Sequence, residues 1–389
     1  MNKNYIKIIK IWTVAQIMTF SVSYISRRIM IRYDQSTSLF AGSSFLDHFL
    51  SWDALHFANI AQYGYFYEHL SAFFPLVPFM AKITGKIFHC NFLITGIILN
   101  NIFFLISSLL IYKISHILIS MHYKPFIKKD SFEAMNIKKN QLAVVSSLCF
   151  ILNPASIIYS VLYTESLFCM LILLGIYFMA LGKKFRAATF FSLASLCRSN
   201  SVVFIVFFTS FLIPFIIIPL ILHQFYFILL YWRNHSKFTL IVPYNYVQKN
   251  YWDQGFLKFI SMKQKENILV GLPVILFCLY TLKFFKTALI NEKIVQFWPK
   301  PTIKWIFDPF NSKTTNLIEK LYIVLWFKIF IVITIIHWNM STRFLSFHPF
   351  FYIVLAKLCI NRRKKFIMFY ILSFRLAYII LFSSYYPPA

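Results

Sequence analysis

Residues 92–120 read FLITGIILNNIFFLISSLLIYKISHILIS, and this stretch decides the fold class. Lys113 is its single Lys, Arg, Asp or Glu residue, and the rest is apolar or weakly polar. A helix needs about 20 apolar residues to cross the hydrocarbon core of a bilayer. The run exceeds that length, so the sequence predicts a transmembrane helix here.

Similar apolar runs follow one another along the chain. Hydrophobic residues make up 59% of the sequence and charged residues 13%, whereas soluble domains have roughly 45–50% and about 25%. We therefore predict an all-α polytopic membrane protein with about 8–11 transmembrane helices, built as a single integral membrane domain over residues 1–389. The other candidate spans are 8–26, 141–161, 164–182, 187–209, 211–232, 267–290, 317–337, 343–360 and 366–383. Segment 71–89 contains prolines and lysines and is predicted to be interfacial or re-entrant.

The charge balance predicts how the chain is oriented. There are 39 Lys and Arg residues against 12 Asp and Glu, a net charge of +27. In a soluble protein this excess would suggest nucleic acid, but between apolar runs it meets lipid headgroups, so we expect no nucleic-acid partner. Basic segments 124–140 and 362–365 and the N-terminus are predicted to be cytoplasmic. Loop 27–70 then lies on the opposite side, and the side of loop 233–266 stays open.

The strongest candidate for a functional segment is WDALHFANIAQYGYFYEHLSAFFPLVP, residues 52–78. It combines two of the scarce carboxylates, Asp53 and Glu68, with Trp52, His56 and several amides. Aromatic faces pack on sugar C–H groups, and carboxylates and amides bind hydroxyls, so the segment suits a sugar-binding surface. The alternative is an amphipathic loop at the membrane interface.

Four more segments inside or beside apolar sequence contain candidate residues. Glu165 lies in NPASIIYSVLYTESLF, residues 153–168, and is either functional or a helix cap. Arg198, followed closely by Asn200, lies in CRSNSVVF, and an arginine fork suits phosphate. Arg343 in NMSTRFLSFHPFFY is a second phosphate candidate. For both arginines the alternative is an anchor at the headgroups. Trp252 lies in the aromatic segment 243–259, which could cover a site.

Several motifs are absent from the sequence. It contains no GxxxxGK[ST], no GxGxxG, no DxD and no HExxH, and its six cysteines form no CxxC pair. These absences argue against a nucleotide-binding loop, a metal-bound nucleotide-sugar site and a zinc protease. We predict no metal ligands. The spans hold few acidic residues, which argues against an ion-coupled transporter.

The quoted blocks resemble the PIG-V family of GPI mannosyltransferases. The match runs in the family's order from about residue 51 to 360 and includes the blocks at 52–78, 153–168, 197–204, 244–259 and 341–356. The W-D loop with AFFP, taken together with Y-T-E-S-L-F, is the specific part. One departure is Ser201, where the family usually has Gly.

The resemblance implies a GT-C type fold in the endoplasmic reticulum membrane with a luminal active site. It implies dolichyl-phosphate-mannose as donor and addition of the second, α1,6-linked mannose to the GPI precursor. The family's catalytic acid lies in the first luminal loop, here Asp53 with Glu68 second. Arg198 and Arg343 are the phosphate candidates, Trp52, His56, Glu165, Asn200 and Trp252 are further substrate-binding candidates, and a small membrane subunit is a further expected partner.

The residue inventory agrees with this chemistry. A phosphate leaving group needs charge stabilisation rather than a general acid, so one carboxylate base and one or two arginines suffice for an inverting single displacement. Two alternatives remain at this point: another dolichyl-phosphate-mannose-dependent mannosyltransferase of the endoplasmic reticulum, and a lipid or solute transporter.

Overall fold

The structure is a computed structural model, and every element in its described part is helical. It describes residues 3–34, 36, 45–123, 132–208, 210–232, 242–258, 264–291, 317–360 and 364–386. Most of the polar excursion 291–316 lies outside these residues, as do residues 124–131 of the basic segment 124–140. The all-α fold class predicted from the sequence is confirmed.

The helices of the described part range from 5 residues in α6 to 32 in α4. The main helices are α1 Lys3–Ile29, α2 Asp53–Tyr63, α3 Leu76–Ile87, α4 Phe92–Tyr123, α5 Phe132–Ile151, α6 Ser156–Ser160, α7 Glu165–Ala180, α8 Lys184–Ser195, α9 Ile213–Phe227, α10 Pro243–Trp252, α11 Lys265–Asn291, α13 Leu317–Thr334, α14 Ser341–Leu345, α15 Pro349–Ile360 and α16 Lys364–Ser383. Short 3₁₀ or π turns are η2 Asp47–Phe49, η3 Glu68–Ala72, η6 Ser199–Phe207, η7 Ser210–Leu212, η8 Ile228–Trp232 and η11 Trp338–Met340.

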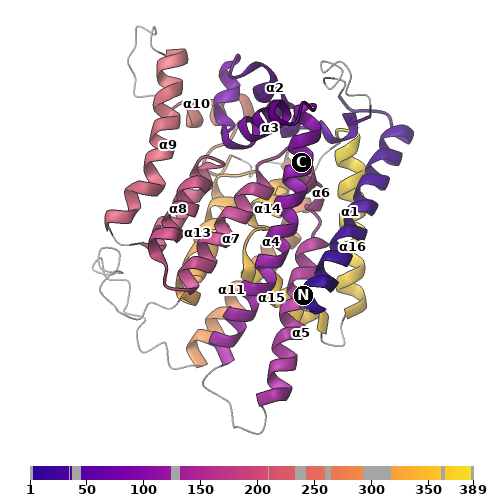
Figure 1. Ribbon diagram of the computed structural model, residues 1–389, viewed down its shortest axis with the longest axis vertical. Coiled ribbons are helices and arrows are strands. Elements are labelled where there is room, and N and C mark those ends of the chain that lie inside the picture. The colour runs from indigo at the N-terminus through magenta and orange to yellow at the C-terminus, as the bar shows by residue number, and fades with distance from the viewer. Residues whose placement is uncertain are drawn as a thin grey trace.

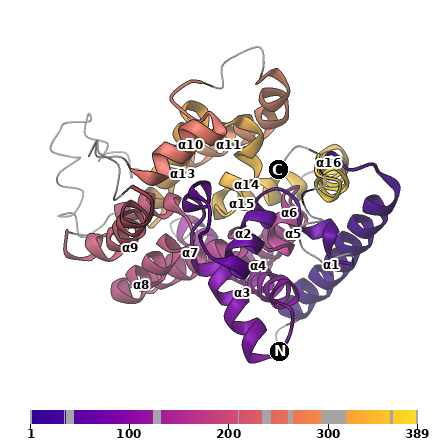
Figure 2. The same cartoon turned by 90° about the horizontal axis from the view of Figure 1, so that it is seen from above.

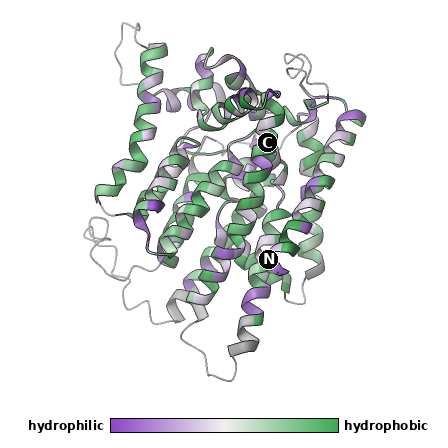
Figure 3. Ribbon diagram, viewed as in Figure 1, coloured by the Kyte–Doolittle hydropathy of each residue, from purple (hydrophilic) through white to green (hydrophobic). Residues whose placement is uncertain are grey.

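Two layers are visible in side view. The long apolar helices run side by side, and α2, α3 and α10 lie across one end of them (Figure 1). The long helices are predominantly hydrophobic. The layer formed by α2, α3 and α10, called the cap below, mixes polar and apolar residues (Figure 3). Viewed from above, α1 and α16 form one edge and α8 and α9 the opposite edge, with α14 and α15 between them (Figure 2).

Five helices in the described part are long and apolar enough to cross a membrane on their own. They are found in α1, α4, α9, α11 and α16, and a sixth span results if the bent pair of Trp338–Leu345 and Pro349–Ile360 counts as one. The chain is therefore a multi-pass membrane protein. Helices α5, α7, α8 and α13 lie in the same layer (Figure 1) but are shorter or more charged. The count of about 8–11 transmembrane helices stays a prediction.

Two predicted spans, 141–161 and 187–209, are not continuous helices. Segment 141–161 divides at Asn153–Pro154 into α5 and α6, since proline cannot donate the next helical hydrogen bond and disfavours helix at the preceding residue. Segment 187–209 divides at Arg198, which is extended (φ −158°, ψ 142°) between α8 and η6. The chain also bends by 92° between α14 and α15. All three breaks lie beside the polar residues described below.

The ends of the helices sort the loops into two groups. The N-terminus, the end of α4, the start of α5 and the start of α16 lie at the end of the molecule away from α2 and α3 (Figure 1). Helix α3 has 12 residues, about 18 Å at 1.5 Å per residue, and is too short to cross a core of about 30 Å. Segment 71–89 therefore stays in the cap, and α10 from loop 233–266 lies in the same layer.

Candidate active site

Four charged side chains from distant parts of the chain form one connected network. The Arg343 Nη2 group donates to Asp53 Oδ2 at 2.5 Å, and its Nε donates to Glu165 Oε1 at 2.7 Å. Arg198 Nη1 donates to the same Glu165 oxygen. Arg343 thus bridges the two carboxylates, and Glu165 bridges the two arginines.

The network contains two positive and two negative side chains, which differ in how far they are exposed to solvent. The side chains of Glu165 and Arg343 are 3% and 4% exposed, whereas Arg198 is 16% and Asp53 is 27% exposed. Burial alone would raise the pKa of Asp53, but the Arg343 guanidinium outweighs it and holds that pKa below its ordinary value. Asp53 is therefore an ionised carboxylate at neutral pH and the accessible one of the pair.

Tyr163 fixes the start of α2, where Asp53 is the first residue. The backbone N–H of Asp53 donates to the Tyr163 hydroxyl at 3.0 Å, and that hydroxyl donates to the Ser51 carbonyl at 3.3 Å. The guanidinium carbon of Arg343 lies 5.1 Å from the centre of the same ring. The sequence reasoning missed Tyr163; its only signal was its place two residues before Glu165.

The backbone next to Asp53 is strained. Trp52 has φ 57° and ψ −127°, in the left-handed half of conformational space that a non-glycine residue rarely adopts. Its ring packs against Tyr385 at a centroid distance of 5.2 Å. Such strain is kept where surrounding contacts over-determine the conformation, and here it coincides with the accessible carboxylate.

Two consecutive asparagines in α4 hold the loop that presents Glu165. Asn100 Nδ2 donates to the carbonyls of Tyr163, at 2.8 Å, and Val161. Asn101 Nδ2 donates to the Ser160 carbonyl at 3.0 Å. These bonds give hydrogen-bond donors to backbone carbonyls at and just after the end of α6. The signal in the sequence was an amide pair inside an otherwise apolar span.

Arg198 is directed at Glu165 by the break between α8 and η6. The hydroxyls of Ser195 and Ser201 are hydrogen-bonded at 2.7 Å across this break. Arg198 also donates to the Thr164 hydroxyl at 3.3 Å. Lys328 donates a hydrogen bond to the backbone carbonyl of Asn200 rather than to its side chain.

An aromatic cluster in the cap adjoins Asp53. His56, one helical turn after Asp53, lies 4.7 Å from Phe73, 5.3 Å from His69 and 6.4 Å from Trp252, measured between ring centres. Burial lowers the pKa of His56, although Asp53 opposes the shift. The structure thus places His56 and Trp252 together, as expected for a sugar-binding surface.

The structure does not bring Glu68 into the carboxylate network. Glu68 begins η3 and lies near Tyr251, whose pKa is raised by burial and by the charge of Glu68. Within the described residues no hydrogen bond or ion pair joins it to Asp53. Glu165, which sequence reasoning ranked with the substrate-binding residues, is the second carboxylate of the network instead.

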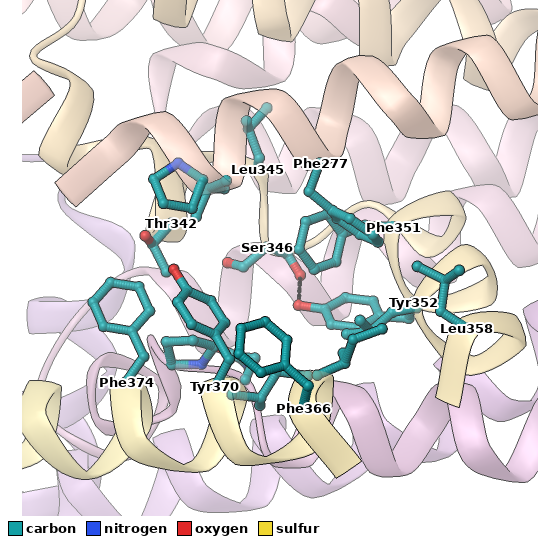
Figure 4. A pocket seen from close by; sticks show the side chains of 17 residues that line it. Phe277, Thr342, Leu345, Ser346, Phe351, Tyr352, Leu358, Phe366, Tyr370 and Phe374 are labelled. Carbon is teal, nitrogen blue, oxygen red and sulfur yellow. Dashed lines mark hydrogen bonds between the residues drawn. The ribbon is translucent and has the colours of Figure 1, made fainter. Parts of the chain in front are cut away.

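An apolar groove opens beside α14. Its volume is about 210 Å³, its floor is α15, and its walls are α11 and α16 (Figure 4). Thr342, Tyr370 and Phe374 lie toward one end, and Leu358 lies toward the other. The Thr342 hydroxyl is buried with no hydrogen-bond partner among the described residues, and Thr342 precedes Arg343 in the chain. The groove therefore begins beside the charged network and is otherwise apolar.

Within the described residues, no group of three or more His, Cys, Asp or Glu side chains is arranged to hold a metal ion. The chemistry available from the four charged side chains is proton transfer and anion binding. The sequence-based expectation of a metal-free site stays a prediction.

Comparisons with known proteins were made for the whole chain. The sequence profile of the family described as Mannosyltransferase (PIG-V) matches residues 34–221 and 204–389. A GPI mannosyltransferase 2 of Drosophila pseudoobscura pseudoobscura is 26% identical over 86% of this chain and 85% of its own length. The GPI mannosyltransferase 2 of Yarrowia lipolytica is 23% identical over 92% of each chain. The human GPI alpha-1,6-mannosyltransferase 2 is 24% identical over 57% of this chain and 55% of its own. No solved structure matches.

Proposed function

Because this chain belongs to the PIG-V mannosyltransferase family, we propose that it transfers mannose from dolichyl-phosphate-mannose to the one-mannose GPI precursor. The product would carry the second mannose in α1,6 linkage. The chain is a membrane-embedded mannosyltransferase, which excludes the transporter alternative. The observation that carries the proposal is the accessible Asp53 carboxylate, held by Arg343 against a buried second carboxylate.

Asp53 is the proposed general base. The acceptor hydroxyl would give its proton to Asp53 while its oxygen bonds to C1 of the donor mannose. The C1–O bond to phosphate breaks on the opposite face, dolichyl phosphate leaves, and the β-linked mannose becomes α-linked. An ionised, partly exposed carboxylate suits this role, and general-base catalysis contributes typically about 10²–10⁴-fold.

The two arginines are proposed to differ in role. Arg343 uses both Nε and Nη2 on carboxylates and is 4% exposed, so it is the residue that positions Asp53. Arg198 is more exposed and retains donors beyond its bond to Glu165. It is therefore the proposed ligand of the donor phosphate, whose charge grows as the C1–O bond breaks.

The two substrates would approach from different directions. The cap cluster of His56 and Trp252 is proposed to bind the acceptor sugar, with Trp52 as a further substrate contact and Glu68 reaching acceptor hydroxyls. The apolar groove under Thr342 is proposed to hold the first part of the dolichyl chain. Its aromatic lining includes Phe366 and Tyr370, which are exposed and would face lipid.

The proposal places the protein in the endoplasmic reticulum membrane with the site in the lumen. The cap carries Asp53, while the Lys-bearing N-terminus and the start of α16 lie at the other end (Figure 1), which agrees with the rule that basic loops stay in the cytoplasm. A small membrane subunit is part of the same proposal.

The test is a transfer assay in microsomes from cells lacking the endogenous enzyme. Radiolabelled dolichyl-phosphate-mannose and a one-mannose GPI acceptor are supplied, and glycolipid products are separated. A two-mannose product sensitive to α1,6-mannosidase is expected with this chain and absent with Asp53→Asn. A product with mannose in another linkage, or on a different acceptor, would redirect the assignment to another dolichyl-phosphate-mannose-dependent enzyme.

A further inference from the structure

A lysine is fully buried in the middle of the apolar helix α13. The Nζ group of Lys328 donates to the Asn200 carbonyl at 3.0 Å. It also lies 4.5 Å from the ring centre of Phe344, 5.2 Å from that of Phe347 and 6.0 Å from that of Phe168. Lys328 is 0% exposed. The carbonyl and the three ring faces are therefore its immediate surroundings.

This position is costly for an ammonium group. No Asp or Glu of the described residues forms an ion pair with Lys328. A lone ionisable side chain inside an apolar helix is energetically costly and is a functional candidate by default. Cation–π contacts offset part of that cost. A leucine would fill the same space more favourably, so packing does not account for this lysine.

Most of the groups around Lys328 are close in sequence to the charged network. Asn200 is two residues after Arg198, Phe344 follows Arg343, and Phe168 lies one turn after Glu165. The Arg198 guanidinium also lies 6.0 Å from the centre of the Phe168 ring. Asn200 is the second residue of η6, directly after the break at which the chain turns Arg198 toward Glu165.

We propose that Lys328 is a positioning residue for Arg198. By holding the Asn200 carbonyl, it fixes the turn between α8 and η6 and so the direction of the guanidinium that meets Glu165. The inference rests on the proposed role of Arg198 in binding the donor phosphate. Loss of Lys328 should therefore weaken the use of donor and leave the chemical step largely intact.

The chain supplies a matched control on the same helix. Lys320, two turns earlier in α13, donates from Nζ to the Phe207 carbonyl at 3.2 Å, at the other end of η6. Lys320→Met removes the same kind of lysine–carbonyl bond from the same two elements, far from Arg198 in sequence. It measures the purely structural effect of such a loss.

The experiment compares steady-state kinetics of the full-length protein in microsomes, with protein quantified by immunoblot. Lys328→Met should raise the donor KM roughly tenfold, the scale of a lost hydrogen bond to a charged group, with kcat within about threefold. Lys328→Gln keeps a donor on a shorter chain and should raise the donor KM about threefold. Lys320→Met should leave the donor KM unchanged.

A second arm tests whether Lys328 acts through Arg198. In an Arg198→Ala background, Lys328→Met and Lys328→Gln should no longer change the donor KM, since coupled residues are not additive. Three results would overturn the proposal: a change in donor KM that persists in the Arg198→Ala background, an equal change in Lys320→Met, or a loss of kcat at constant donor KM. If Lys328→Met is not recovered in membranes, Lys328→Gln gives the same comparison.

The protection of the purified protein against heat by dolichyl phosphate separates this inference from the proposed function. If the wild-type chain transfers no mannose, the proposed reaction is refuted. The Lys328 variants can then still be compared with wild type by how much dolichyl phosphate raises the unfolding temperature of each protein. A shift equal in wild type, Lys328→Met and Lys328→Gln would contradict the positioning role.

Discussion

Replacing Asp53 with Asn changes the charge of the proposed base and little else. Asn keeps an oxygen that can accept from Arg343, and the bond stays charge-assisted because the guanidinium is still charged; what is lost is the attraction between two opposite charges. Because Asp53 is 27% exposed and Arg343 keeps its bond to Glu165, we expect a stability loss of about 1 kcal/mol or less.

The loss of turnover should be larger than this. General-base catalysis of about 10²–10⁴-fold corresponds to about 2.7–5.4 kcal/mol at 1.36 kcal/mol per tenfold. The measurement is turnover at saturating donor and acceptor, divided by the amount of folded protein. Asp53→Asn should lose about 10²-fold or more, with the donor KM little changed.

The matched control for Asp53→Asn is Glu68→Gln, the same change of charge in the other cap carboxylate. Glu68 has no described bond to the network, so its turnover should fall only mildly. Near-normal turnover of Asp53→Asn together with collapse of Glu68→Gln would transfer the base role to Glu68. Normal turnover of both would refute the reasoning and leave Glu165 as the candidate.

Three other predictions concern topology, the groove and pH. Glycosylation acceptor sites inserted within 27–50 should be modified and those within 124–140 should not, because basic loops stay in the cytoplasm; the reverse pattern would invert the topology. Leu355→Trp, which fills the floor of the groove, should raise the KM for the full dolichyl donor but not for a short-chain analogue; equal effects would show that the lipid chain lies elsewhere. Burial holds the pKa of His48 at about 4, below its ordinary 6.5, so its contribution to stability is complete above pH 6.5 and is lost as pH falls toward 4. His48→Gln should flatten that part of a thermal-unfolding profile against pH, and an unchanged profile would assign the loss to other groups.

Much of the site could be predicted because acidic residues are scarce in this sequence. With 12 acidic residues in 389, a carboxylate beside apolar runs is rare, and an arginine there needs an anionic partner. That reasoning identified Asp53, Glu165, Arg198 and Arg343 one by one. The resemblance to the PIG-V family, which the whole-chain comparison confirms, supplied the expected reaction.

The assembly of these residues could not be predicted, because it depends on helix packing. Arg343 is 290 positions from Asp53 and 178 from Glu165, and no local pattern reports such pairings. Tyr163 was missed for another reason: it is one of 23 tyrosines, and only its place two residues before Glu165 marks it out. Its role follows only from the position of its hydroxyl beneath the first N–H of α2.

The helix breaks at Pro154 and Arg198 also differ in how far the sequence predicts them. The break at Pro154 has a local cause that the sequence displays. The break at Arg198 has neither proline nor glycine beside it; the extended backbone there accompanies the ion pair with Glu165. A tertiary contact therefore accounts for a boundary that hydropathy alone reads as a continuous span.

The position of Arg343 late in the chain also bears on how the protein is made. Ribosomes add about 5–20 residues per second, so roughly 15–60 s separate the synthesis of Asp53 from that of its partner 290 residues later. Until then Glu165 has only Arg198 as a counter-ion, and Asp53 has none from this network. A nascent chain that stops before α14 would present an uncompensated carboxylate, a feature by which membrane quality control could distinguish unfinished copies from complete ones.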